Sequence, residues 1–248
     1  MKEVKPYNSD HGKTEEVEQM FDSIAPAYDF MNKAMSFGLH RKWRDKALDA
    51  VQEEVQSAAP LKILDVACGT GDVAFELLNR FPNAQVTGVD LSEGMLKIAE
   101  EKKDSLIAQA RDRVKFEKGN CLHLDYTDDS FDLVTVAYGV RNFEDLPAGL
   151  REMQRVLRPG GRICIIELSE PEKGIAKALY RFYSRCLIPI AGRVVSGDSR
   201  AYSYLPESIA AAPQRYDMVK LMQKAGLSDC NWKSLSLGAL TYYVGIKG

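Results

Sequence analysis

The 248-residue chain has no excess of charge of one sign, since 33 Lys and Arg residues against 35 Asp and Glu give a formal net charge of −2. A nucleic-acid-binding protein usually carries a basic surface, so this balance argues against nucleic acid as a partner. Cysteine is sparse as well: there are five, and no two form a Cys-x-x-Cys pair. We therefore expect reduced thiols in a cytoplasm, with neither a disulfide framework nor a metal site.

Long apolar runs are also lacking. Residues 1–13 are polar and charged, unlike a secretory signal peptide. No stretch reaches the roughly 18 apolar residues that a spanning helix needs. The most apolar late stretch, residues 175–195, contains Lys177, Arg181, Arg185 and Arg193. We expect a cytoplasmic protein that does not span a membrane but could lie on the inner face of one.

The hydrophobic pattern differs between the first part of the chain and the rest. Residues 14–56 have a helical pattern, in which Val17, Met20, Phe21 and Ile24 recur on one face. From residue 61, short apolar runs alternate with helical patterns. The expected strands are residues 62–67, 85–90, 114–119, 131–137 and 162–168, and the expected helices are residues 71–80, 92–109 and 145–157. This β-α-β-α order predicts a mostly parallel sheet with helices on both faces.

The end of the chain differs from the repeated β-α pattern. A helix is expected at residues 216–225, followed by an antiparallel pair at 229–235 and 240–246 that joins the sheet edge. We therefore divide the chain into an N-terminal helical cap at residues 1–60 and an α/β domain at 61–248. That domain contains an insertion at about 172–213.

The strongest local signal is Asp65-Val66-Ala67-Cys68-Gly69-Thr70-Gly71-Asp72, where an apolar strand runs into a glycine-rich turn and a helix begins. The glycines let the backbone turn sharply and come close to a ligand. Asp90 ends the next strand about 20 residues later, where its carboxylate can accept hydrogen bonds from both ribose hydroxyls of a nucleoside. We expect Asp65, Gly69, Gly71 and Asp90 to bind a nucleoside cofactor.

The cofactor class follows from the charge of the loop. A dinucleotide site uses three glycines and places a pyrophosphate at the helix N-terminus. Here Ala67 stands at the first glycine position, and Asp72 would oppose a pyrophosphate. S-adenosylmethionine has no phosphate and carries a cationic amino group and sulfonium, which Asp65 and Asp72 suit better. The loop therefore favours S-adenosylmethionine over a nicotinamide cofactor.

Three further segments resemble one family. They are Tyr28-Asp29-Phe30-Met31-Asn32 with Ser36, His40 and Trp43; Tyr138-Gly139-Val140-Arg141-Asn142; and Arg155-Val156-Leu157-Arg158-Pro159-Gly160-Gly161 with Glu167-Leu168-Ser169. Together they resemble the signatures of the ubiquinone/menaquinone biosynthesis C-methyltransferases. The resemblance covers roughly residues 14–248. It implies a class I S-adenosylmethionine-dependent methyltransferase: a Rossmann-like, mostly parallel seven-stranded sheet with an antiparallel last strand, plus N-terminal helices.

The resemblance also implies that Thr70, Asp90, Asn120 and Cys121 contact the cofactor. Asn120 and Cys121 follow the third strand, a position from which they could contact the edge of the adenine ring. Asn120 also suits a simple turn. Many family members have Ser where this chain has Ala137. A hydroxyl contact at that position would therefore be absent here.

The implied reaction is methylation of a ring carbon of a polyprenylated quinol. We expect demethylmenaquinol (2-polyprenyl-1,4-naphthoquinol), which becomes menaquinol. The alternative is a 2-methoxy-6-polyprenyl-1,4-benzoquinol of ubiquinone biosynthesis. A methyltransferase for another small molecule or a sterol, and a non-catalytic cofactor-binding partner in quinone synthesis, are further alternatives.

The expected substrate-handling residues are Arg141 and Asn142, after the fourth strand, and Tyr28 from the N-terminal helices. Arginine is no ordinary base at neutral pH. Arg141 would therefore stabilise a phenolate or polarise the water that receives its proton, and Asn142 would bind the second ring oxygen. The alternatives are a surface salt bridge of Arg141 with Glu144 or Asp145, and helix packing for Tyr28.

Two other polar residues have a structural alternative that we favour. His40 could be a general base, but it also suits a packing position beside Trp43. Glu167 ends the fifth strand and suits a buried ion pair better than catalysis.

The insertion has an apolar stripe and a basic face. At helical spacing, residues 175–190 place Leu179 and Phe182 among other apolar residues, with Lys177, Arg181 and Arg185 on the opposite side. Such a segment suits a polyprenyl tail and contact with an anionic membrane. The alternative is a helix that faces the core or forms a homodimer.

Overall fold

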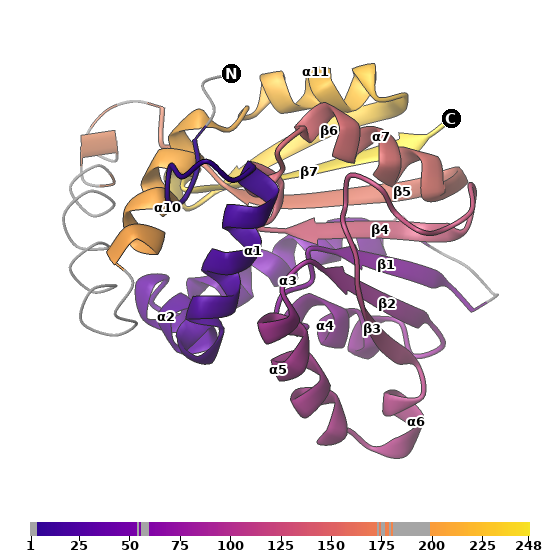
Figure 1. The fold of residues 1–248 in the computed structure, drawn as a ribbon. Helices are drawn as coiled ribbons and strands as arrows, with labels where there is room; N and C mark the ends of the chain where they lie inside the picture. The colour runs from indigo at the N-terminus through magenta and orange to yellow at the C-terminus, as the bar shows by residue number, and fades with distance from the viewer. Residues whose placement is uncertain are drawn as a thin grey trace.

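The computed structural model describes residues 4–53, 55, 60–172, 174, 177–178, 180 and 199–248. Its centre is a seven-stranded sheet in the order β3-β2-β1-β4-β5-β7-β6 (Figure 1). The strands are β1 (Lys62–Val66), β2 (Gln85–Asp90), β3 (Val114–Lys118), β4 (Phe131–Ala137), β5 (Leu157–Leu168), β6 (Leu227–Leu235) and β7 (Leu240–Lys247). Strands β1 to β5 are parallel, and β7 runs antiparallel to both of its neighbours. The predicted fold class is confirmed.

Helices cover both faces of the sheet because its central strands are apolar on both sides. On β1, Ile63 packs in one buried cluster with α3 (Leu39–Gln52) and α4 (Asp72–Arg80), whereas its neighbour Leu64 packs in another with α7 (Leu146–Val156) and α11 (Tyr216–Lys224). Both side chains are fully buried. Burying one such side chain contributes about 1.5–3 kcal/mol. This alternation fixes the sheet between two layers of helices.

A third buried cluster connects the N-terminal helices with a helix late in the chain. It joins α1 (Lys13–Ile24) and α2 (Tyr28–Met35) to α5 (Glu93–Asp104) and α10 (Ser199–Ala211) through Met20, Met31, Met95 and Tyr204. The short helix η1 (Ala25–Ala27) separates α1 from α2, since Pro26 interrupts the helical pattern there. In Figure 1, α1, α2 and α10 lie together at one end of the sheet.

The boundaries differ from the predicted ones in three places. Strand β5 begins at Leu157 rather than at residue 162, because Leu157 already pairs with Phe131 of β4, while residues 158–161 form an irregularity before regular pairing resumes at Arg162. The helix expected at 92–109 is α5 followed by α6 (Ala108–Arg111). In the final pair, β7 lies between β5 and β6, so β6 forms the sheet edge.

The insertion at 172–213 is described only in part. It contains α10, while most of the stripe at residues 175–190 lies outside the described residues. Among the residues that are described, no helix combines the length and apolarity needed to cross a bilayer.

Candidate active site

The glycine-rich loop lies between β1 and α4 and borders a cavity of about 720 Å³. Gly69 lines this cavity, has φ +56°, and leaves open space where a Cβ would stand. Its backbone N–H donates to Oδ2 of Asp90 at 2.8 Å. Both features fit the predicted cradle for a nucleoside.

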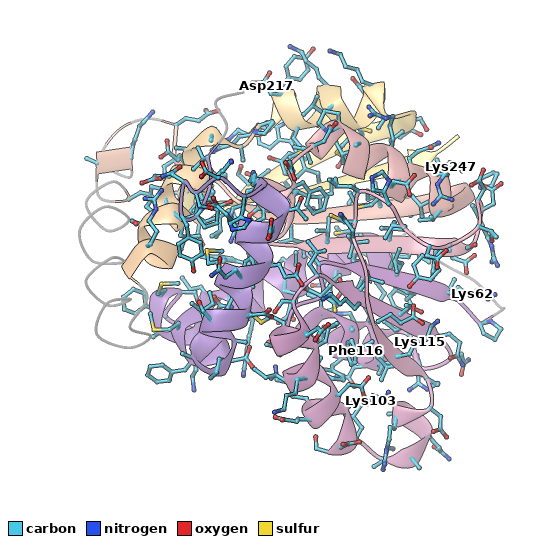
Figure 2. All side chains as sticks on the ribbon, viewed as in Figure 1. Lys62, Lys103, Lys115, Phe116, Asp217 and Lys247 are labelled. Carbon is cyan, nitrogen blue, oxygen red and sulfur yellow. The ribbon has the colours of Figure 1, made fainter. Side chains whose placement is uncertain are left out.

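Gly71 packs against aromatic rings, and the cofactor contact predicted for it stays a prediction. It does not line the cavity, and a Cβ there would lie 2.8 Å from the ring of Phe116 and 2.9 Å from that of Phe75. These rings pack edge to face with centroids 5.5 Å apart, and Figure 2 labels Phe116 beneath the sheet. Gly71 therefore makes room for aromatic packing, and its φ of +81° adds a second need for glycine.

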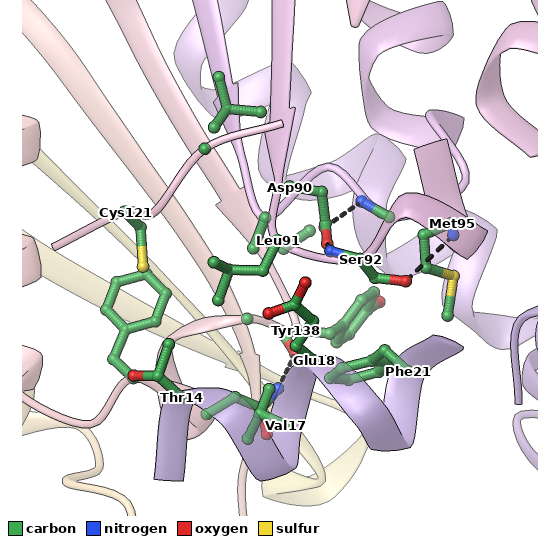
Figure 3. A pocket seen from close by; sticks show the side chains of 18 of the residues that line it. Thr14, Val17, Glu18, Phe21, Asp90, Leu91, Ser92, Met95, Cys121 and Tyr138 are labelled. Carbon is green, nitrogen blue, oxygen red and sulfur yellow. Dashed lines mark hydrogen bonds between the residues drawn. The ribbon is translucent and has the colours of Figure 1, made fainter. Parts of the chain in front are cut away.

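Asp90 lines the first cavity, and Figure 3 shows its side chain there near Leu91 and Ser92. Its other oxygen, Oδ1, accepts from the N–H of Ser92 at 2.9 Å, so each carboxylate oxygen bonds one backbone N–H. Burial raises the pKa of Asp90 above its ordinary value, although the bonds from Ser92 and Gly69 act the other way. The carboxylate is thus fixed in orientation and retains lone pairs toward the cavity.

Helix α1 supplies the opposite wall of the first cavity. Its contributions are Thr14, Val17, Glu18 and Phe21, while the strand ends contribute Ala67, Cys121 and Ala137. Hydrogen bonds of Lys13 and Thr14 connect the start of α1 to the loop after β4. The buried ammonium of Lys13 donates to the carbonyl oxygens of Arg141 and Phe143, both at 3.1 Å, and Glu144 accepts from Thr14. Nothing in the local sequence around Lys13 indicates this long-range contact.

Thr70 and Asp72 lie behind the first cavity and do not line it. Thr70 donates to Asp29 of α2 at 2.7 Å and accepts from Lys102 at 2.9 Å. Lys102 also pairs with Asp29 at 2.6 Å and with Asp72 at 2.8 Å. Burial raises the pKa of Asp72, but the hydrogen bond and charge of Lys102 outweigh it, so the pKa is lowered. Asp72 thus pairs with Lys102 in this structure, and its expected interaction with a cationic cofactor stays a prediction.

Asp65 lies within β1 and is almost fully buried. Thr135 donates to its Oδ1 at 2.7 Å, and its Oδ2 has no hydrogen-bond partner among the described residues. Burial raises the pKa of Asp65 to about 7. Asp65 does not line the cavity, so its predicted cofactor contact is at most an indirect one in this structure.

We predict a pH-dependent stability from Asp65. The folded protein holds this proton more tightly than the unfolded chain, whose aspartate pKa is about 3.9. The folded state therefore loses stability as pH rises from about 4 through about 7. Asp65→Asn should remove this loss, so in urea titrations without cofactor its advantage over the wild type should grow across that window and then level off. A constant difference would contradict the assignment.

Asn120 and Cys121 follow β3, and only Cys121 lines the first cavity. The side-chain oxygen of Asn120 accepts from the N–H of Leu122 at 2.9 Å, which is the turn alternative. Burial raises the pKa of the Cys121 thiol to about 12, so this residue presents a neutral wall. An adenine contact from Asn120 stays a prediction.

The predicted substrate-handling residues lie on one short segment after β4. Arg141 and Asn142 belong to η2 (Val140–Asn142). The side chains of Arg141 and Glu167 are 7% and 3% exposed and form an ion pair of 2.9 Å between Nη1 and Oε1. Glu167 Oε2 also accepts from the backbone N–H of Arg141 at 3.2 Å. Arg141 is therefore buried, and its partner is Glu167 rather than Glu144 or Asp145.

A second cavity, of about 1,420 Å³, adjoins the first. Its wall is largely apolar and comes mainly from α1, α2, α3 and α10, with Arg141 as its buried charge. Three aromatic residues, Phe21, Tyr28 and Tyr138, line both cavities. The rings of Phe21 and Tyr28 meet edge to face with centroids 6.0 Å apart. Sequence reasoning proposed Tyr28 but missed Phe21 and Tyr138.

The remaining candidates divide between the two cavities. Asn142 lines the first one, and its Oδ1 accepts from the hydroxyl of Tyr204 at 3.2 Å. His40 lines the second one, with Nδ1 2.6 Å from Oγ of Ser36. Burial, and then the charge of Arg44, lower the pKa of His40, so its ring is neutral at pH 7. The structure thus brings Tyr28, Arg141 and Asn142 to the boundary between the cavities, with His40 further into the second.

Comparison with known proteins agrees with this geometry. A model of the ubiE/COQ5 methyltransferase family matches residues 9–247. The chain is 45% identical over 245 residues to the demethylmenaquinone methyltransferase of Porphyromonas gingivalis, covering 98% of each. It is 42% identical over 246 residues to that of Bacteroides fragilis, covering 98% of this chain and 97% of the relative. Among solved structures, the [4+2]-cyclase SpnF has a TM-score of 0.66 at 18% identity, covering 96% of this chain and 97% of its own. That likeness shows the fold alone.

Proposed function

The chain belongs to the ubiE/COQ5 methyltransferase family, and from that premise we propose how its two cavities carry out the reaction. S-adenosylmethionine is the cofactor, and the activity is C-methylation of a quinol in menaquinone biosynthesis. The specific reaction that we propose converts demethylmenaquinol to menaquinol. The observation that carries the proposal is the pair of adjoining cavities, one polar at Asp90 and one apolar, with a common aromatic wall.

The first cavity suits the cofactor. Gly69 leaves the space of a missing Cβ, Asp90 offers a fixed carboxylate to ribose hydroxyls, and Cys121 gives a neutral surface for an adenine ring. When bound, the cofactor supplies an electrophilic methyl carbon on a sulfonium.

The second cavity suits the quinol and its polyprenyl tail. Its apolar wall can accept the tail, and Arg141 is the buried charge that meets the ring. Nε of Arg141 has no hydrogen-bond partner among the described residues. We propose that Arg141 uses it to stabilise the phenolate, whose charge spreads to the ring carbon that is methylated. Asn142 and Tyr28, on the boundary, would orient the ring, and the aromatic wall would exclude water.

The N-terminal cap proposed at residues 1–60 then has a defined purpose, because α1 lines both cavities and α2 and α3 supply much of the wall of the quinol cavity. For localisation we propose a cytoplasmic protein in peripheral contact with the inner face of the cell membrane, where a polyprenylated substrate resides. A tail-binding or dimer-forming role for residues 175–190 remains a hypothesis about a segment that is largely outside the described residues.

Turnover with purified protein tests the proposal. With S-adenosylmethionine and a short-chain demethylmenaquinol, mass spectrometry should detect a ring-methylated product, with a higher kcat/KM than for the matching methoxybenzoquinol. A preference for the benzoquinol would move the protein to ubiquinone biosynthesis. Cofactor binding without turnover of either quinol would instead favour a non-catalytic partner.

A further inference from the structure

Exposed apolar side chains gather around the second cavity. Among the described residues, seven large apolar side chains are exposed, and four of them form what we name the rim patch: Phe30 (63%), Phe37 (82%), Leu39 (38%) and Leu237 (83%). Phe37 and Leu39 themselves line the cavity. A single exposed apolar residue is ordinary, whereas a cluster around a cavity marks an interaction surface.

Phe30 and Leu237, the other two members of the rim patch, do not line the cavity, but each is next in sequence to a residue that does. Phe30 precedes Met31, which lines it, and Leu237 follows Ser236, which also lines it. Ser236 accepts a hydrogen bond of 2.7 Å from the indole N–H of Trp43, so η4 (Ser236–Gly238) is held against α3. The rim patch thus belongs to elements that wall the second cavity, although its members come from distant parts of the chain.

The backbone at two of these residues adds a second observation. Phe37 has φ +51° and Leu237 has φ +58°, in the left-handed region that favours Gly or Asn. Each residue therefore combines an unfavourable backbone conformation with a large apolar side chain in water. At Phe37 the conformation ends α2, because its N–H donates to Ala34 and the N–H of Gly38 donates to Lys33. At Leu237, burial of the exposed side chain in a lipid phase would offset the unfavourable conformation.

Basic residues outnumber acidic ones on the two helices, α2 and α3, beside the patch. Lys33, Arg41 and Lys42 are exposed, and the described residues offer them no ion pair. The acidic residues of the same two helices have basic partners on other helices: Asp29 pairs with Lys102, and Asp45 and Asp49 share Arg80. The surface that carries the rim patch is therefore basic.

We infer that the rim patch and these three basic residues dock the enzyme onto an anionic lipid bilayer, with the second cavity opening toward the membrane. Apolar side chains beside Lys and Arg are the combination that binds such an interface. The inference deepens the proposed function and rests on it, because a lipid-tailed quinol gives the cavity a reason to face lipid. It locates the membrane contact on α2, the α2–α3 turn and η4, instead of the stripe at residues 175–190.

Flotation with lipid vesicles tests this surface directly. Wild-type protein should float with vesicles of phosphatidylglycerol and phosphatidylcholine, less well as salt rises, and poorly with phosphatidylcholine alone. Phe30→Ser with Leu237→Ser should lower the partition coefficient about tenfold or more, and Arg41→Glu with Lys42→Glu should abolish the preference for anionic vesicles. None of these four residues lines either cavity, so thermal unfolding and cofactor affinity should be unchanged.

A matched control lies on α6 and beside it, where Ile107 is 73% exposed and Arg111 is a nearby basic residue. Ile107→Ser with Arg111→Glu should leave flotation at the wild-type level. Wild-type flotation by the rim variant, or no flotation of the wild type, would overturn the inference.

Turnover separates this inference from the proposed function. The rim variant should keep wild-type turnover of a tail-less quinol in water and lose turnover of a long-tailed quinol in vesicles. An equal loss for both substrates would overturn the inference. If no quinol is methylated but flotation still depends on the rim patch, the docking surface stands and the proposed function fails.

Discussion

Asp90→Ala should lower the affinity for S-adenosylmethionine by at least about tenfold, measured by isothermal titration calorimetry. The change removes two charge-assisted hydrogen bonds to the ribose, each of which contributes about 1.5–3 kcal/mol. It also removes the two bonds that fix the N–H groups of Gly69 and Ser92. The loss should therefore exceed that of an ordinary surface contact.

Glu93→Ala is the control for this prediction. Glu93 follows the same strand by three positions, but its carboxylate is exposed and pairs with Lys118. Its removal should leave cofactor affinity unchanged. Wild-type affinity in Asp90→Ala would show that the ribose is held elsewhere.

Arg141→Ala should lower kcat about a hundredfold or more while cofactor affinity stays near the wild-type value. The arginine faces the quinol cavity and not the cofactor cavity, so the effect falls on the substrate ring. The same change leaves Glu167 buried without its ionic partner. Breaking a buried pair in this way costs about 3–5 kcal/mol of folding stability.

A second variant separates activity from stability. Arg141→Met with Glu167→Gln removes both charges and keeps similar volumes, so the free energy of unfolding should recover toward the wild-type value. Its kcat should remain as low as that of Arg141→Ala. Turnover near the wild-type rate in this stable variant would mean that the ion pair is purely structural.

The sequence predicted the sheet because its signals are local. Apolar runs such as residues 131–137 and the turn at Gly69 depend on neighbouring residues, and the corresponding strands and turn are present. The start of β5 was misplaced because Pro159 and Gly160 are typical of a turn. The turn is present, with Gly160 at φ +76°, but it is an irregularity inside β5, because Leu157 before it and Arg162 after it both pair with β4.

The site was harder to predict because its partners are distant in sequence. Lys102 lies 30 residues from Asp72 and 32 from Thr70, and it changes the role of both. The aromatic wall needs Phe21 and Tyr138, which no local motif connects. Asp90 could be found because its strand and the glycine-rich loop determine its surroundings. Electrostatic roles, in contrast, depend on tertiary contacts that periodicity does not encode.

The position of β7 has a consequence for how the chain is made. Strand β7 lies between β5 and β6. It pairs with β5 over nearly its whole length, from the pair Leu240 and Leu168 to the pair Ile246 and Arg162. During synthesis, the outer edge of β5 therefore stays without its native partner until residues 240–247 have left the ribosome. Unpaired strand edges are prone to bind other chains. Late in translation, the nascent protein would thus need protection by a chaperone more than its finished fold does.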